Sequence, residues 1–255
     1  FPPRTRWEEK GYRPDEYSRW LLGNWRPIED LWSELGTSAL TVGETRCAYP
    51  PYNRIPVARA EIPEGIILSR EVDSFIREEE IKDTALPLYE GRMIGQFDYS
   101  QKGWVSGRGR NAVWRDIEWE QKQIEPQFLM QKQDLETKIS LRKSSRLGYM
   151  DVTSSTNSRT TISSIIKFMP CGNRVNLFSL SKENLYPLSS ILNSFCYDFY
   201  MRQKLTGIII NYFIIEESFI PKLSRISKTL HNLALRLNGC GTLFSEDWVS
   251  SYKFN

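Results

Sequence analysis

The segment of this chain whose residues are best suited to bind a ligand is Lys102–Asn111, a glycine-rich run with several basic side chains. Its three glycines allow a close approach of the backbone to a phosphate, because no Cβ stands in the way. The side chains that supply charge or hydrogen bonds are Lys102, Ser106, Arg108, Arg110 and Asn111. We expect this segment to contact nucleic acid, and the alternative is a hairpin tip whose basic side chains are only solvated.

Positive charge is also concentrated over residues 138–174, whereas acidic side chains outnumber basic ones over residues 1–90. The basic residues of this stretch are Lys138, Arg142, Lys143, Arg146, Arg159, Lys167 and Arg174, and its one acidic residue is Asp151. A polyanion would be attracted to such a stretch. The formal net charge of the whole chain, +3, is too small to indicate nucleic-acid binding by itself.

Within this basic stretch, Ser155-Thr156-Asn157 is followed closely by Arg159. Ser, Thr and Asn side chains form turns by hydrogen bonding to their own backbone, so a structural turn is the first interpretation. The alternation that follows, with Ile162, Ser164 and Ile166, predicts a strand entering a core. Arg159 could still reach a phosphate or a guanine edge from such a turn.

Patterns typical of catalytic sites are weak. Tyr49-Pro50-Pro51-Tyr52 has the Pro-Pro-aromatic order of amino-methyltransferases, but tyrosine in the first position cannot act as the amide or carboxylate acceptor, so we expect a linker. Glu120 and Lys122 have the Glu-x-Lys spacing of metal-dependent nucleases, yet that spacing recurs elsewhere in the chain. With one histidine, His231, and no Gly-x-Ser-x-Gly sequence, a serine nucleophile is not indicated. We expect this chain to be non-catalytic and to hold no cofactor or metal.

The cysteines are far apart and form no Cys-x-x-Cys pair, so neither a zinc site nor a redox motif is indicated. No apolar run approaches the roughly 20 residues of a membrane span, and no secretory signal opens the chain. We expect a cytoplasmic protein with reduced cysteines and no membrane partner. Because the sequence opens at Phe1 without a methionine, we also expect a fragment of a longer protein.

The element expected to organise the rest is a long helix over Asn184–Lys204. Its apolar residues recur at spacings of three and four and predict one buried stripe, formed by Leu185, Leu188, Leu192, Phe195 and Phe199. Cys196 lies in the same helix and is expected to be buried. After Gly207, which should end the helix, the apolar segment Ile208–Ile215 predicts a short strand.

Other helices are predicted at both ends of the chain. Pro14–Leu22 and Pro27–Leu35 each begin with a proline and end near a glycine. Leu223–Leu237 carries a second three-four stripe, with Gly239 as its cap. The tail Asn238–Asn255 is expected to lead into a further segment. Four tryptophans near the N-terminus indicate either core packing or an interface with a missing domain, namely Trp7, Trp20, Trp25 and Trp32.

Short apolar runs separated by turn residues predict strands between these helices. The predicted strands are Ile66–Ser69, Met93–Tyr99, Ala112–Ile117, Phe128–Gln131, Leu147–Thr153, Thr160–Met169 and Val175–Leu180. Strands followed by long helices are typical of an α+β domain with a mixed or antiparallel sheet. The predicted division is a helical connector over residues 1–65, a strand-rich domain over 66–221 and a C-terminal helix and tail over 222–255.

Three separate motifs carry a family resemblance. The first is Pro87-Leu88-Tyr89-Glu90-Gly91-Arg92-Met93-Ile94, continuing to Gln96-Phe97-Asp98. The second is Ser155-Thr156-Asn157 with Arg159-Thr160, and the third is Asn193-Ser194-Phe195 with Tyr197-Asp198, Arg202-Gln203-Lys204 and Asn211-Tyr212-Phe213. In this order and spacing, over roughly Ile66 to Pro221, they resemble the DNA target recognition region of bacterial type IIG-like restriction–modification enzymes, whose other half is an N6-adenine methyltransferase.

The resemblance implies sequence-specific binding of double-stranded DNA, so that the methyltransferase half of the same polypeptide can modify an adenine in phage defence. The longer protein would then use S-adenosylmethionine, and Mg if it also carries a nuclease. The residues expected to contact DNA are Arg92, Gln96, Lys102, Ser106, Arg108, Arg110, Asn111, Lys143 and Arg159. The alternatives are a protein-interaction module that docks defence-complex subunits through the tryptophan-rich section and, less favoured, a metal-dependent nuclease.

Overall fold

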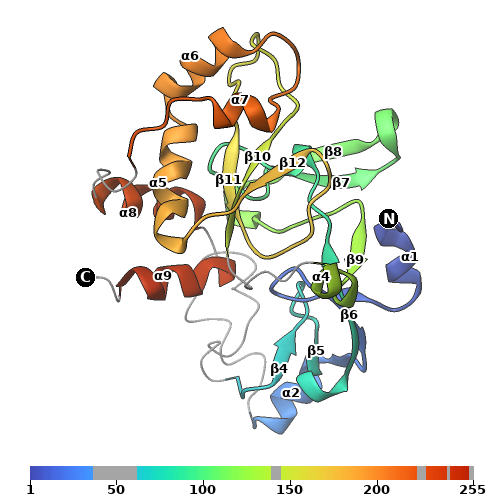
Figure 1. Ribbon diagram of the computed structural model, residues 1–255. Coiled ribbons are helices and arrows are strands. Elements are labelled where there is room, and N and C mark those ends of the chain that lie inside the picture. Colours follow the sequence, from blue (N-terminus) through green and yellow to red (C-terminus); the bar gives the residue numbers. More distant parts are fainter. Residues whose placement is uncertain (37–61, 139–144, 223–227, 240–241, 253–255) are drawn as a thin grey trace. The chain divides into compact units, whose positions relative to one another are not determined.

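In the computed structural model, residues 1–36, 62–138, 145–222, 228–239 and 242–252 are described (Figure 1). Helices and antiparallel sheets are both present, which confirms the predicted α+β class. The chain forms two compact units. The first comprises Phe1–Pro87, Glu118–Gln123 and Gln127–Ile139, and the second Leu88–Ile117, Ile124–Pro126 and Ser140–Asn255. The expected boundaries after residues 65 and 221 each fall inside one of these units.

The first unit contains a four-stranded antiparallel sheet of order β1-β2-β6-β9. Its strands are β1 (Arg13–Pro14), β2 (Trp20–Gly23), β6 (Ile81–Pro87) and β9 (Leu129–Gln131). Helices α1 (Arg4–Glu9) and α4 (Lys132–Lys138) belong to the same unit. Trp7, Trp20 and Leu129 meet in a small buried cluster, where burial of apolar area stabilises the sheet.

The predicted helix Pro14–Leu22 is wrong, since this segment forms β1, a turn and β2. The cause is Asp15, whose buried carboxylate accepts hydrogen bonds from the backbone N–H groups of Tyr17 (3.0 Å) and Arg19 (2.7 Å). The Arg19 guanidinium also donates to it over 2.7 Å. An aspartate that satisfies backbone donors in this way favours a turn over a helix. Its own burial raises its pKa.

A second antiparallel sheet of the first unit has the order β3-β5-β4 and packs with helix α2. Its elements are β3 (Arg26–Pro27), α2 (Ile28–Glu34), β4 (Ile66–Leu68) and β5 (Ser74–Arg77). The helix predicted at Pro27–Leu35 is thus confirmed. Trp32 is buried against this sheet, as Trp7 and Trp20 are buried in the other cluster. The tryptophans of the N-terminal section therefore pack mainly in the core. The Tyr49–Tyr52 segment lies outside the described residues.

The second unit is built on a three-stranded antiparallel sheet of order β11-β10-β12. Its strands are β10 (Arg146–Met150), β11 (Ser163–Ile166) and β12 (Val175–Phe178), and helix α5 (Lys182–Leu192) packs on β11 and β10 (Figure 1). Leu147, Ile165 and Leu192 are fully buried in the largest hydrophobic core of the described residues. A separate hairpin of β7 (Lys102–Ser106) and β8 (Val113–Asp116) projects from this unit.

The long helix predicted over Asn184–Lys204 is two helices, α5 and α6 (Phe195–Lys204). The break lies at Asn193, whose side-chain amide pairs with the backbone of Ser163 in β11: it accepts from the Ser163 N–H (3.1 Å) and donates to the Ser163 carbonyl (2.9 Å). Ser194 then caps α6 by accepting from the Tyr197 N–H over 3.1 Å. Asn193 and Ser194 therefore end one helix and begin another.

Because of this break, the end of the predicted buried stripe faces solvent. Leu185, Leu188 and Leu192 are buried, but Phe195 is 80% exposed and Phe199 is 67% exposed. Cys196, expected to be buried, is also exposed and is a free thiol. The segment predicted as the strand Ile208–Ile215 contains only an isolated bridge from Ile209 to Val152, followed by helix α7 (Tyr212–Glu216).

The described part of the second predicted helix is α8 (Lys228–Asn238), and residues 223–227 lie outside the described residues. The described part of its predicted stripe does not face the core, because Leu230, Leu233 and Leu237 are exposed while Ala234 and Leu235 are buried. The described part of the tail is folded. A 3₁₀ turn (Thr242–Phe244) and helix α9 (Ser245–Tyr252) follow, and Phe244 is fully buried in the core of the second unit.

Among the predicted strands, six correspond to β4, β8, β9, β10, β11 and β12. Met93–Tyr99 is not a strand, because Phe97 has a positive φ of 58° and Gly95 bridges to Asp98 across a tight turn. Six strands were not predicted, namely β1, β2, β3, β5, β6 and β7. Several of their side chains are charged or glycine, which hides the alternation of a strand.

Candidate nucleic-acid interface

The glycine-rich segment folds as the β7–β8 hairpin, with Trp104 opposite Trp114 and a bulge between Trp104 and Ser106. At its tip Gly107 has φ +77°, and a Cβ there would lie 2.2 Å from the Asn111 carbonyl oxygen. Only glycine fits this position. The indole N–H of Trp104 donates to the Gly107 carbonyl over 3.0 Å. The tip is therefore held in one conformation by contacts inside the hairpin.

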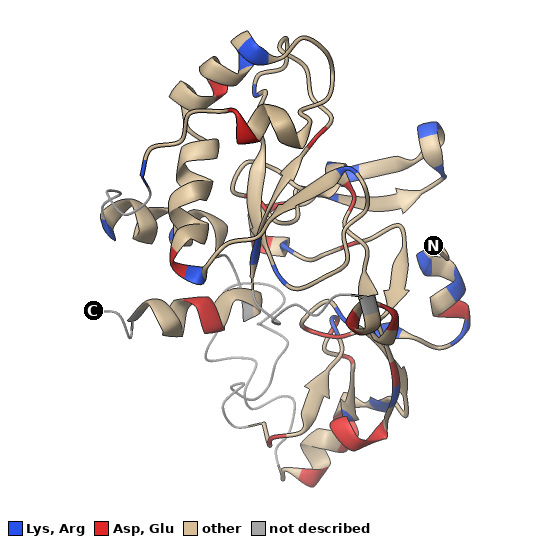
Figure 2. Cartoon of the chain, viewed as in Figure 1, with Lys and Arg blue, Asp and Glu red and all other residues tan. Residues whose placement is uncertain are grey.

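Two arginines stand at this tip. Arg108 and Arg110 are exposed, on either side of Gly109, and neither forms an ion pair with another described residue. Basic residues on the strands differ, since Lys102 pairs with Asp116 over 3.0 Å and Arg115 pairs with Glu125. Ser106 and Asn111 are also exposed. The hairpin thus presents two guanidinium groups without carboxylate partners among the described residues. Figure 2 colours the Lys and Arg positions of the β7–β8 hairpin blue.

Arg92 lies in the 3₁₀ turn Gly91–Met93, close to β7, and is exposed. Gln96 has a structural partner instead, because its amide nitrogen donates to the Asn193 carbonyl over 2.7 Å at the α5–α6 break. That contact occupies the group expected to meet a base. Lys143 lies outside the described residues, so its position is not assigned.

The Ser155–Thr160 segment forms the expected turn within a longer loop, residues 154–161, which we call the 154–161 loop. The Ser154 hydroxyl accepts from the Thr156 N–H over 3.2 Å. The side chains of Ser155, Thr156, Asn157 and Ser158 are exposed. Arg159 places its guanidinium 3.9 Å from the ring centroid of Phe195 in α6, and its Nη1 is buried without a hydrogen bond.

The structure therefore separates the expected DNA-contacting residues into two groups within the second unit. Lys102, Ser106, Arg108, Arg110 and Asn111 share the hairpin, with Arg92 near its base. Gln96 and Arg159 lie by the start of α6, at a different corner of the unit (Figure 1).

Two functional candidates that the expected set omitted are Asp198 and Arg202 of α6, which bind the backbone of the 154–161 loop. Burial opposes the ionisation of Asp198, but hydrogen bonds from the Thr161 N–H, the Arg202 guanidinium and the Thr160 N–H outweigh it and lower its pKa. Their i, i+4 spacing is the usual one for a helical ion pair and was a signal available in the sequence.

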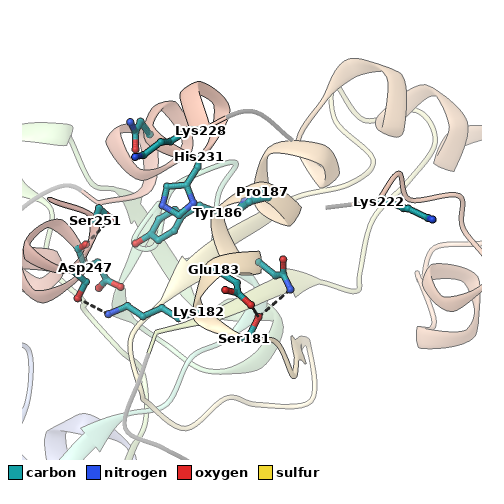
Figure 3. Close-up of a pocket in the computed structure, with 13 residues that line it drawn as sticks. Ser181, Lys182, Glu183, Tyr186, Pro187, Lys222, Lys228, His231, Asp247 and Ser251 are labelled. Carbon is teal, nitrogen blue, oxygen red and sulfur yellow. Dashed lines mark hydrogen bonds between the residues drawn. The ribbon is translucent and has the colours of Figure 1, made fainter. Parts of the chain in front are cut away.

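A pocket of about 980 Å³ also occurs in the second unit, between α5, α8 and α9 (Figure 3). Lys182, Lys222, Lys228, His231 and Asn232 contribute polar groups to its walls. Lys182 donates to the Ser250 hydroxyl over 2.8 Å. Buried Asp247 accepts from the Ser145 hydroxyl (2.9 Å) and from Lys167 Nζ (2.6 Å), so its carboxylate joins α9 to the strand region.

The one histidine of the pocket, His231, is a side chain that could act as a base there. The His231 imidazole packs edge-on against Tyr186, with ring centroids 5.1 Å apart, and burial and then the charge of Lys228 lower its pKa. It forms no hydrogen bond to a described Ser or Asp, so the pairing of nucleophile and base that acyl transfer requires is not present among these residues.

Glu120 and Lys122, the residues with the Glu-x-Lys spacing of metal-dependent nucleases, lie on or next to a 3₁₀ turn. Glu120 is exposed in the 3₁₀ turn Trp119–Gln121, and Lys122 lies 4.6 Å from the Trp119 ring centroid. No cluster of three or more His, Cys, Asp or Glu side chains suited to a metal occurs among the described residues. In the same part of the chain, no helix has the length and apolar character needed to cross a membrane.

Comparisons with family models, with curated proteins and with solved structures gave no match to this chain.

Proposed function

We propose that this chain binds double-stranded DNA sequence-specifically, as the target recognition domain of a type IIG-like restriction–modification protein. The observation that carries the proposal is the β7–β8 hairpin, whose glycine-fixed tip presents Arg108 and Arg110 to solvent. Guanidinium groups bind phosphates and guanine edges through several N–H donors at once. A β-ribbon is also one of the two elements that fit the major groove.

The contacts inside the tip support this proposal over a merely solvated hairpin. Trp104 closes the tip from inside, and no described carboxylate neutralises the two arginines. An ordered loop loses less entropy when it binds, so more of the contact energy appears as affinity. In this role the longer protein supplies S-adenosylmethionine binding and methyl transfer, with Mg if a nuclease is present, and the chain described here supplies the DNA contact.

The proposal is tested by measuring the affinity of the chain for duplex DNA at several salt concentrations. Each phosphate contacted contributes a slope of about −0.9 to log affinity against log salt. Replacing Arg108 and Arg110 together by Ala should weaken binding and make that slope shallower by roughly two units. If one arginine reads a base, the slope changes less and the preference for one position is lost.

The control is the double change Arg6→Ala in α1 and Lys10→Ala at the C-terminal cap of that helix, which removes the same charge from exposed residues of the first unit. This control should leave the slope unchanged. Equal affinity, slope and sequence preference in the hairpin variant and the wild type would refute a DNA contact by the hairpin.

A second candidate function has its own observation. Large apolar side chains are exposed from α6 to the segment that follows α7, namely Phe195, Phe199, Ile208, Tyr212, Phe213 and Phe219. Exposed apolar surface of this kind is typical of protein contacts. A protein-docking module would therefore use this region, because Trp7, Trp20 and Trp32 of the N-terminal section are buried. Docking predicts partner binding that is insensitive to Arg108 and Arg110 and lost on changing Phe199 and Phe213 to Ser.

A further inference from the structure

One turn of α6 holds the 154–161 loop through its backbone. Arg202 donates from Nη1 to the Ser155 carbonyl (2.7 Å) and from Nη2 to the carbonyls of Asn157 (2.7 Å) and Ser158 (2.8 Å). Asp198 accepts from the N–H groups of Thr160 (2.7 Å) and Thr161 (2.9 Å) through one carboxylate oxygen. Its other oxygen accepts from Arg202 Nε over 2.9 Å.

These contacts leave the loop's side chains free to meet a ligand. Five backbone groups of the loop are bonded to two side chains of the helix, and charge-assisted bonds of this kind are the stronger ones. The polar side chains of Ser155, Thr156, Asn157 and Ser158 remain exposed. The Thr156 hydroxyl is bonded to the Ser154 hydroxyl over 2.8 Å, whereas no side-chain hydrogen bond occupies Ser155, Asn157 or Ser158 among the described residues. A loop with a bound backbone and such exposed polar side chains is ordered before any ligand arrives.

The same helix also orients the one basic side chain of the loop. Phe195 stands one turn before Asp198, and its exposed ring lies under the Arg159 guanidinium. Stacking on an aromatic face fixes the plane of an arginine. Because Nη1 of Arg159 is buried, a contact with a base would use the other N–H donors of this guanidinium. Asp198 and Arg202 therefore hold the loop backbone, and Phe195 holds its arginine.

We propose that Asp198 and Arg202 are positioning residues that fix the 154–161 loop so that its side chains read base edges of duplex DNA. This role rests on the proposed DNA-binding function and extends it from phosphate contact at the hairpin to base selection at a second place. We do not assign Arg202 as a DNA contact, because four of its five N–H donors are used by Asp198 and by the loop carbonyls.

The stabilisation of the loop backbone by Arg202 is measured first, by amide hydrogen exchange of the protein without DNA. In Arg202→Gln, the amides of residues 154–161 should exchange at least about tenfold faster, since opening of this loop would no longer break the arginine contacts. The matched control is Lys204→Gln. Lys204 lies in the same turn of α6 and carries the same charge, but it donates to the Glu217 carbonyl (3.0 Å) and does not contact the loop.

Base reading is measured next, by selection from a randomised duplex library with the wild type and each variant. The wild type should select a preferred sequence, and Arg202→Gln should lose about tenfold in discrimination at one or more of its positions. The salt slope should stay unchanged, because no phosphate contact is removed. Arg202→Lys keeps the charge but offers one nitrogen in place of a fork, so it should not restore discrimination. Lys204→Gln should discriminate like the wild type.

The outcomes separate this role from the proposed function. A wild type that binds no duplex overturns both. Wild-type binding that depends on Arg108 and Arg110, together with full discrimination by Arg202→Gln, overturns the positioning role alone. If Arg202→Gln does not fold, as judged by thermal melting, Asp198→Asn replaces it. That variant keeps an oxygen acceptor for Thr160 and Thr161 but weakens the bond to Arg202, so it should also lose discrimination.

Discussion

Two neighbouring residues on the predicted helix, Leu192 and Phe195, provide a direct test of the break between α5 and α6. On a continuous helix both would lie in one buried stripe, and their replacement by alanine would be similarly costly. In the structure Leu192 is 0% exposed, whereas Phe195 is 80% exposed. The perturbations compared are Leu192→Ala and Phe195→Ala.

The magnitudes follow from burial. Leu192→Ala should cost about 2–5 kcal/mol, the usual range for removing a buried leucine side chain. Full burial of a phenylalanine is worth about 1.5–3 kcal/mol, and Phe195 hides only a fifth of its surface, which leaves roughly 0.3–0.6 kcal/mol. Its contact with the Arg159 guanidinium adds about 0.5–1 kcal/mol at an exposed site. Phe195→Ala should therefore cost roughly 1 kcal/mol.

Urea unfolding measures both values, provided that the denaturant slope stays constant between variants. Phe199→Ala is the matched control, because Phe199 is 67% exposed on the same helix and is not among the rings stacked with a cation. Phe199 hides about a third of its surface, so the same calculation gives roughly 0.5–1 kcal/mol for Phe199→Ala. It should therefore cost less than Phe195→Ala by only a few tenths of a kcal/mol, because its greater burial offsets part of the missing cation–π contribution. A loss at Phe195 as large as the loss at Leu192 would show that α6 continues the buried face of α5, and would refute the break.

Two further predictions concern single side chains. A thiol reagent should label exposed Cys196 in the folded protein but label Cys171 only after unfolding, because burial raises the pKa of the Cys171 thiol to about 12. Peptide mapping by mass spectrometry checks this prediction, with Cys196→Ser as the control. Burial and the charge of Lys228 lower the pKa of His231, so the unfolded chain binds more protons and the free energy of unfolding should fall as pH drops below about 6.5. His231→Asn should remove that part of the pH dependence, and a difference between the two proteins that stays constant from pH 7.5 to pH 5 would contradict it.

Local sequence signals predicted the parts of the structure that depend on a few neighbouring residues. The glycines of Lys102–Asn111 indicated a backbone open to close approach, with a hairpin tip as the alternative interpretation, and Gly107 occupies a position at the tip that only glycine fits. The Ser-Thr-Asn turn at 154–157 is also present. In both cases the backbone conformation follows from side chains within the segment itself, so no distant partner is needed. Local signals predicted the wrong structure for Pro14–Leu22, where the carboxylate of Asp15 competes with helix formation.

Whether a predicted contact residue is free to bind a ligand could be learned only from the tertiary structure. Gln96 has the right chemistry to read a base, yet its amide is bonded to the Asn193 carbonyl, which is far away in sequence. Arg108 and Arg110 have the same basic character as Arg115, but only Arg115 meets a carboxylate, that of Glu125. Residue type predicts what a side chain can bind, and the fold determines whether another group already occupies it.

Along an unbroken helix the sequence by itself determined which residues share a face, because a repeat of three and four residues sets that geometry. The repeat did not show that the helix breaks at Asn193. Only the tertiary structure decided which face is buried. On α8 the repeat of Leu230, Leu233 and Leu237 is real but exposed, and the buried face includes Asn238. The Asn238 amide accepts from the Ile165 N–H over 2.9 Å and so binds α8 to β11, just as Asn193 binds the α5–α6 break to the same strand. Buried polar groups need specific partners, and those partners come from segments that no local pattern can identify.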